Sequence, residues 1–277
     1  MSAIASFSEF KALLENGTRS AVFNFGVGNI GTITGLLSTY RSYQGGAVPS
    51  VPVACYGNDP TALMYIPLTN SKQMWVGDME FAYGNSGQGT KLAAVLYDRL
   101  VHSGGLVGNV ITEQATNLPS AALPRYTDGV GVVPFMEVYT SLGTVATTAT
   151  IKYTNQDGVP NCISKPVTVA TNVNNGTDSL TPFPLADGDT GCRSVEGFTM
   201  AGAAAAAGSI GITLMRRIIA LPVDTGSMVE RQSYRQTFFA GSIAEIKPGA
   251  FLQLTTLCST SGTGFHAFLG RIGIIEK

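Results

Sequence analysis

Residues 147–160 read TTATIKYTNQDGVP, and this stretch decides the fold class of the chain. Ala149, Ile151 and Tyr153 alternate with threonine and lysine side chains, so apolar residues occupy every second position. A period of two is typical of a strand with one buried face. The Asp157-Gly158 pair that follows is a turn signal. The sequence therefore predicts a half-buried β-strand that ends in a tight turn.

Similar segments recur along the chain after residue 72. They are rich in β-branched and aromatic residues and are bounded by Gly, Pro, Asn or Ser. No helical pattern separates them, which is typical of a sandwich or barrel. We expect the last two strands of the chain to form a hairpin, because a Ser/Gly/Thr turn joins them. The further expected strands are Met74–Tyr83, Lys91–His102, Val130–Thr140, Lys165–Ala170, Ser194–Ala201, Ser209–Pro222, Ala250–Cys258 and His266–Ile275.

The first quarter of the chain has a different character. Ser6 and Glu9 form a capping-box pattern, and Gly17 predicts the end of a short helix. This helix is too short to be stable alone, so it must dock on its own domain or on a neighbouring subunit. A second helix is expected over Thr32–Tyr40, and the prolines from Gln44 to Pro67 predict an extended arm. The apolar face of the first helix consists of Phe7, Phe10, Leu13 and Leu14.

These patterns together predict a mainly all-β chain. We expect an antiparallel β-sandwich or jelly-roll-like domain with a short N-terminal helix and an extended proline-rich arm. Residues 1–72 are expected to form the helix and the arm or connector, and residues 73–277 the β-sandwich domain.

Gly26, Gly28 and Gly31 spell G-x-G-x-x-G after the apolar run Ala21–Phe25, which matches the dinucleotide-binding fingerprint. Such a loop works in a parallel sheet, whose crossovers need a helix after each strand. Here the alternation of strand and helix stops after one candidate unit. The sequence therefore favours tight turns or close chain contacts at these glycines, and we expect no cofactor.

The chain carries few charges. Charged residues make up 13% of its 277 residues, and the formal net charge is −1. Typical soluble domains have about twice that charged fraction, roughly 25%. This composition gives no electrostatic footprint for nucleic acid, and no apolar run reaches the roughly 18 residues of a membrane helix. One consequence is that other protein chains are expected to cover much of the surface.

Cysteine and histidine give no metal-ligand spacing. The four cysteines contain no C-x-x-C pair, and the chain has only two histidines. We therefore expect no metal site and reduced, mostly buried thiols.

The densest polar cluster lies in VLYDRLVHSGG, residues 95–105. On a regular strand Asp98 and His102 share one face, an arrangement that a hydrolase could use. No nucleophile motif accompanies them. The favoured interpretation is a strand end at which Asp98 or Arg99 pairs with a neighbour and His102 starts a turn, and we assign no catalytic residue.

Three other groups of residues have simple structural interpretations. Asp187 and Asp189 form a D-x-D fragment without the further ligands of a calcium loop, so we expect a polar turn. His266 is expected to be a packed or interface histidine. Arg216 and Arg217 are expected at a strand rim or a subunit contact, a placement common for arginine. Together with the apolar face of the first helix, they form our candidate interface.

Short motifs recur at Leu96–Gly105, at Leu123–Gly131 (LPRYTDGVG) and at Tyr153–Gly158 (YTNQDG). With the later PLADGDTGCRSVEGFTMAG and GSIGITLMRRIIALP, they resemble a family of structural proteins encoded by tailed bacteriophages and prophages. The resemblance covers about Leu92 to Pro222 and implies a β-rich virion component without enzymatic activity or cofactor. Cys162 departs from the pattern, which has a threonine- or glycine-rich strand start there.

The first hypothesis for function is a capsid decoration or cement protein that stabilises the head by bridging major capsid subunits. Its expected partners are itself, as a homo-oligomer (a trimer), and the major capsid protein, with no nucleic acid and no membrane. Its expected location is the virion, after synthesis in the bacterial host cytoplasm. The alternatives are a neck, tail or baseplate protein, and a receptor- or carbohydrate-binding module. For the last of these, Trp75 would be the aromatic platform to test, although its position favours a place in the core.

Overall fold

The computed structural model describes most of the chain from residue 52 onward and two strands before it. The described residues are 8, 12, 18–27, 37–39, 52–59, 62–66, 68, 72–85, 92–118, 122–169, 179–223, 230–233, 244–258 and 266–277. Within these ranges the expected fold class is confirmed. The structure is almost entirely β, and every pairing between its strands is antiparallel.

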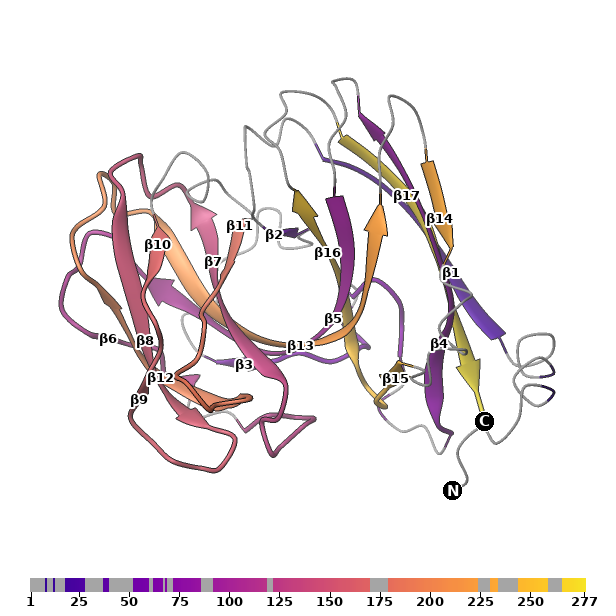
Figure 1. Cartoon of the computed structure of the whole chain (residues 1–277), viewed down its shortest axis with the longest axis horizontal. Coiled ribbons are helices and arrows are strands. Elements are labelled where there is room, and N and C mark those ends of the chain that lie inside the picture. Colours follow the sequence, from indigo (N-terminus) through magenta and orange to yellow (C-terminus); the bar gives the residue numbers. More distant parts are fainter. Residues whose placement is uncertain are drawn as a thin grey trace.

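The central sheet is closed on itself. Its order is β13-β7-β11-β2-β16-β5-β3, and β13 also pairs with β5, so all of its strands except β3 form a ring (Figure 1). Figure 1 shows β13 as one long curved ribbon, and it pairs with both β7 and β5. We call these strands the ring. They are β13 (Ser209–Val223), β7 (Val132–Thr140), β11 (Ser179–Pro182), β2 (Leu37–Thr39), β16 (Phe251–Cys258) and β5 (Leu92–Leu106), and β3 is Val53–Ala54.

Two outer sheets pack on opposite parts of the ring (Figure 1). The first outer sheet has the order β10-β8-β12-β6, with β9 paired to β8. Its strands are β10 (Val167–Val169), β8 (Thr147–Asn155), β12 (Cys192–Met200), β6 (Gln114–Ala115) and β9 (Cys162–Ile163). The second has the order β1-β17-β4-β14, with β15 paired to β4. Its strands are β1 (Thr18–Val27), β17 (His266–Glu276), β4 (Met74–Asn85), β14 (Glu230–Ser233) and β15 (Glu245–Ile246).

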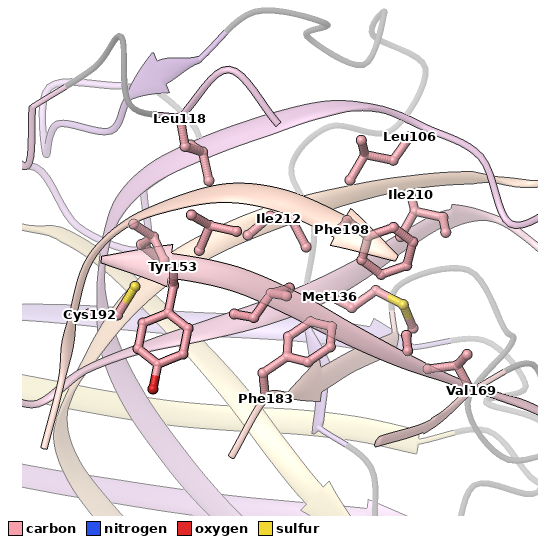
Figure 2. Close-up of a cluster of buried hydrophobic side chains, with 14 of the residues drawn as sticks. Leu106, Leu118, Met136, Tyr153, Val169, Phe183, Cys192, Phe198, Ile210 and Ile212 are labelled. Carbon is pink, nitrogen blue, oxygen red and sulfur yellow. The ribbon is translucent and has the colours of Figure 1, made fainter. Parts of the chain in front are cut away.

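The alternation predicted for residues 147–160 is confirmed in β8. Ala149, Ile151 and Tyr153 are buried, and the threonine and lysine side chains between them are partly exposed. The buried side chains belong to an apolar cluster between the first outer sheet and the ring (Figure 2). In Figure 2, Phe198 of the outer sheet and Met136 of the ring belong to the same cluster.

A separate apolar cluster lies between the ring and the second outer sheet. Met74 and Val76 of β4 and Ile272 and Ile274 of β17 face Leu96, Leu252 and other ring residues there. A third, smaller cluster lies on the inner face of the ring and consists of Val95, Tyr97, Phe135, Leu180 and Met215, with Val133 against it. The molecule is thus two β-sandwiches that share one closed sheet.

Two expectations about individual elements are wrong. The last two strands do not form a hairpin, because β16 pairs with β2 and β5 in the ring whereas β17 pairs with β1 and β4 in the second outer sheet. Residues 37–39 of the expected second helix form strand β2, which pairs with both β11 and β16.

The N-terminal segment contributes strands to both sandwiches. β1 pairs along its whole length with β17, while β2 and β3 join the ring and its edge. Residue 72 is therefore not a boundary between sheets. Phe7, Phe10, Leu13 and Leu14 of the expected helix lie outside the described residues, as do Gly28 and Gly31; Gly26 lies inside β1.

Candidate functional site

A β-bulge in β5 organises the polar residues of the central sheet. Along β13 the neighbours Leu214 and Met215 pair with Val101 and Arg99, so Leu100 is an extra residue in β5. An extra residue shifts the phase of the strand's alternation. Leu100 and Val101 consequently both belong to the cluster under the first outer sheet. Arg99 and His102 instead both contact Glu137 on the inner face of the ring.

Arg99 holds the centre of the inner face. Its Nη2 donates to Glu137 Oε2 at 2.8 Å, and its Nη1 lies 3.4 Å from Glu137 Oε1 and 3.3 Å from Gln253 Oε1. Both members of the ion pair are buried, with side chains 2% and 0% exposed. The contacts join β5, β7 and β16, because each strand provides one of the three residues. A buried charge pair of this kind fixes how the strands are arranged.

His102 extends the network to Thr213 on β13 and to Tyr139 on β7. Its Nδ1 lies 3.0 Å from Thr213 Oγ1, and its Nε2 lies 2.6 Å from Tyr139 Oη. The Thr213 hydroxyl donates to Glu137 Oε2 at 2.7 Å. These bonds connect β5, β7 and β13, and the side chains involved are all buried. We call Arg99, Glu137, Gln253, His102, Tyr139 and Thr213 the inner network.

Gly211 makes room for the inner network. It lies on β13 opposite Glu137. A Cβ on Gly211 would meet Tyr139 Oη at 2.8 Å and His102 Cε1 at 2.9 Å. Both distances are shorter than real Cβ contacts, so only glycine at this position leaves space for the imidazole and the phenol.

A second polar group lies on the outer face of the ring, between the two large apolar clusters. Asp98 Oδ1 and Oδ2 accept hydrogen bonds from Arg125 Nη2 and Nε at 2.7 and 2.8 Å. Arg125 Nη2 also donates to the carbonyl oxygens of Cys55 and Arg99, and the Phe251 amide donates to Asp98. Asp98 lies opposite Arg216 in the register.

The two buried carboxylates have opposite pKa shifts. Burial raises the pKa of Asp98 above its ordinary value of 3.8, and the bonds from Arg125 and Phe251 offset this only in part. Burial would also raise the pKa of Glu137. There, the charges of Arg99 and His102 and the Thr213 hydroxyl outweigh burial, and the pKa falls below 4.5. Both carboxylates are fully buried.

The structure separates the candidate pair Asp98 and His102. The expectation that they share a face is wrong, because the bulge at Leu100 places His102 in the inner network and Asp98 on the outer face. The expectation that Asp98 or Arg99 pairs with a neighbour is confirmed for both residues. The expected strand end and the turn at His102 are wrong, because β5 continues through His102 to Leu106.

The remaining candidates lie in separate places. Asp187 and Asp189 lie at a turn and use different partners: Asp187 pairs with Lys165, whereas Asp189 accepts from Tyr153 and Asn155. His266 lies in β17, opposite Val27 and Asn85. Arg216 stacks over the Tyr126 ring at 4.2 Å, and Arg217 is exposed on β13.

The segments that carry the resemblance meet in the fold. Arg125 of Leu123–Gly131 binds Asp98 of Leu96–Gly105. Arg193 donates to the carbonyl oxygens of Asp128 and Gln156, and so joins Leu123–Gly131 to Tyr153–Gly158. Gly191 is packed against Gly129 so closely that a Cβ would collide with its backbone. The motif residues thus bind one another and hold the strands in place.

Five residues of these polar groups were not identified from the sequence: Glu137, Tyr139, Thr213, Gln253 and Arg125. The first four lie in expected strands, and the i, i+2 spacing of Glu137 and Tyr139 along β7 gave a signal that these two share a face. Their meeting with β5 depends on the register of a closed sheet, which no local pattern specifies. Arg125 lies in a loop, where the sequence gives no alternation.

The described residues contain no group of three or more His, Cys, Asp or Glu side chains that could hold a metal ion. Cys55, Cys162 and Cys192 are free thiols, as expected, and burial raises the pKa of Cys55. Among the described residues, no helix is long and apolar enough to cross a membrane.

No protein-family model and no curated protein matches the chain. The matching solved structures include particles of infectious bursal disease virus. The Gt strain structure has a TM-score of 0.21 and 11% identity, and covers 94% of this chain and 80% of that chain. The VP2 subviral particle has a TM-score of 0.20 and 10% identity, and covers 93% and 80%. At TM-scores this low the likeness carries no argument about this chain.

Proposed function

We propose that the protein is a non-enzymatic structural subunit of a tailed-bacteriophage virion, namely a capsid decoration protein that bridges major capsid subunits. The observation that carries the proposal is the use made of the polar motif residues. Asp98, Arg99 and His102 bind partners inside the fold and tie the strands of the ring together. Buried hydrogen bonds and ion pairs between strands hold those strands in one arrangement, and a fixed arrangement suits a component that must brace a shell.

The composition and the exposed apolar side chains support the same role. With 13% charged residues, the chain has few groups to keep its surface hydrated. Tyr65 and Leu68, between β3 and β4, are 63% and 48% exposed, and Val159 and Ile163, beside β8, are 51% and 54% exposed. Apolar area buried between subunits contributes about 25 cal/mol per Å² before the costs of association. Such contacts at the seams of a shell would resist the outward pressure of packaged DNA.

A neck, tail or baseplate role would use the same rigid body and the same kind of surface. The carbohydrate-binding alternative has less support, because Trp75 is buried in β4 with 8% of its surface exposed. Tyr56 and Tyr65 are the large exposed aromatic side chains among the described residues, so they are the ones to test for glycan binding.

The proposal is tested by titrating the purified protein onto expanded empty phage heads and measuring bound copies by sedimentation. We expect saturable binding, with weaker binding to unexpanded heads. Two matched double variants locate the contact: Tyr65→Ser with Leu68→Ser, and Val159→Ser with Ile163→Ser. Loss of binding in one pair identifies the face used. Absence of saturable binding to heads argues against decoration, and binding to purified tails instead supports the alternative.

A further inference from the structure

Arg216 extends from β13 on the outer face of the ring, next to the buried pair of Asp98 and Arg125. Its guanidinium carbon lies 4.2 Å from the centroid of the Tyr126 ring. Among the residues that the structure describes, no hydrogen bond or ion pair involves this guanidinium, although every arginine carries N–H donors in a planar fork. The Arg216 side chain is only partly buried, so these donors are available to a group from outside the fold.

The loop that begins at Tyr126 holds the Arg216 side chain in place. Tyr126 has a φ of 52°, in the left-handed region that is unfavourable for a bulky residue. Such a conformation persists only where the surroundings enforce it, and it is frequent at binding sites. A Cβ on Gly131 would lie 3.6 Å from Arg216 Nε, so the backbone of this residue also lies beside the guanidinium. A side chain fixed in this way loses little conformational freedom when a ligand binds.

The charges around Arg216 do not balance. Asp98 lies opposite Arg216 in the register of β5 and β13, but both of its carboxylate oxygens accept hydrogen bonds from Arg125. Arg125 also has a donor to spare, because its Nη1 atom is buried without a hydrogen-bond partner. Glu245, whose charge also acts on this region, pairs with Lys247 at 2.8 Å. The two arginines thus share one carboxylate, and one positive charge is left uncompensated.

We propose that Arg216 is the anchor of a carboxylate-binding site on the outer face of the ring, with the Tyr126 ring and the Gly131 backbone as positioning groups. The planar guanidinium presents paired N–H donors that match the two oxygens of a carboxylate. The single uncompensated charge suits a monoanion. A dianion such as sulfate would bring a second negative charge toward Asp98. The inference rests on this polar group and does not depend on the proposed function.

The test is an NMR titration of the full chain with acetate at constant ionic strength. The signals to follow are the Nε–H group of Arg216 and the backbone amide of Gly131. We expect both signals to shift saturably with acetate, and sulfate to bind more weakly. Absence of a saturable shift at Arg216, an equal response at the exposed Arg217, or tighter binding of sulfate than of acetate would overturn the proposal.

Matched variants test the anchor and its support, with the backbone amide spectrum as the check that each one folds. Arg216→Gln should abolish the acetate response of the Gly131 amide, whereas Arg217→Gln on the same strand should keep it. Arg216→Lys keeps the charge but loses the planar fork, so acetate affinity should fall about tenfold. Tyr126→Leu removes the stacked ring and should weaken binding, whereas Tyr126→Phe should not. Unchanged affinity in Arg216→Gln or in Tyr126→Leu would contradict the assigned roles.

A further comparison identifies the source of the carboxylate. The probes are acetate, a blocked tripeptide with a central glutamate, and the same tripeptide with a central glutamine. Tighter binding of the glutamate peptide than of acetate supports the site as a contact for an acidic side chain of another protein chain. Equal affinity of the two supports a small free carboxylate. A glutamine peptide that binds as tightly as the glutamate peptide would overturn carboxylate recognition.

Discussion

Leu100 and Val101 are adjacent in β5, yet both face the apolar cluster beneath the first outer sheet. Adjacent residues of a regular strand face opposite sides. The bulge between the register pairs Leu214–Val101 and Met215–Arg99 accounts for the exception. It also turns Arg99 and His102 to the same inner face, and so assembles the inner network.

If both residues are core residues, both truncations should be costly. Leu100→Ala should lower the free energy of unfolding by about 2–5 kcal/mol, and Val101→Ala should also destabilise, because each leaves a cavity. Val145→Ala, at a site 53% exposed, is the control and should change stability by about 0.5 kcal/mol or less. Urea unfolding measures all three. A Val101→Ala protein as stable as the control would contradict the bulge.

Glu137 and Asp98 should affect the pH dependence of stability in opposite directions. The pKa of Glu137 is lowered in the fold, so its contribution is present above pH 4.5 and is lost as the pH falls below that value. The pKa of Asp98 is raised, so the folded state binds a proton more readily than the unfolded chain. Relative to Asp98→Asn, the unmodified protein should therefore gain stability as the pH falls toward 3.8.

The opposite pH dependences of Glu137 and Asp98 can be checked by measuring the free energy of unfolding from neutral pH down to the acid limit of folding. The proteins to compare are the unmodified protein, Glu137→Gln and Asp98→Asn. Glu137→Gln should be less stable by about 3–5 kcal/mol at neutral pH, because Arg99 loses its buried partner. The difference in unfolding free energy between Glu137→Gln and the unmodified protein should become smaller in acid. Parallel pH profiles for the two variants would refute the assignment.

Arg125 is predicted to stabilise the fold mainly by neutralising Asp98. Arg125→Met removes the bonds to Asp98 and to two carbonyl oxygens and leaves a buried carboxylate unpaired, at a cost of about 3–5 kcal/mol. The double variant Asp98→Leu with Arg125→Met should recover part of that stability, since apolar replacements of a buried pair are often tolerated. A double variant less stable than Arg125→Met alone would show that the pair has a different role.

Gly211→Ala should disturb the inner network directly. The new methyl group would lie within 3 Å of Tyr139 Oη, His102 Cε1 and the Ser103 carbonyl oxygen, and overpacking of this kind costs about 1–3 kcal/mol. The matched control is Gly202→Ala. There the atom nearest to the new methyl group would be the Thr147 hydroxyl oxygen at 3.1 Å, which belongs to a side chain outside the inner network. Thermal unfolding, with the ring ¹⁵N shifts of His102 as a second readout, should separate the two variants.

Local patterns predicted the elements better than their arrangement. The alternation in β8 and the apolar content of β5, β7 and β13 identified these strands, because burial of one face or both leaves a direct mark on sequence. The separation of β16 from β17 and the pairing of β2 with two ring strands are set by contacts between distant residues. The extra residue at Leu100 places Asp98 and His102 on opposite faces of the sheet, although the alternation predicted one shared face. A bulge of this kind leaves no signal in the local sequence.

The proposed role as a subunit of a virus shell is tested by imaging particles that carry labelled protein. Gold-labelled protein added to expanded empty heads, imaged by cryo-electron microscopy, should occupy equivalent positions on the shell, with density that fits two sandwiches around one ring. Label that stays in solution, or that scatters without fixed positions on heads and tails alike, would contradict the claim.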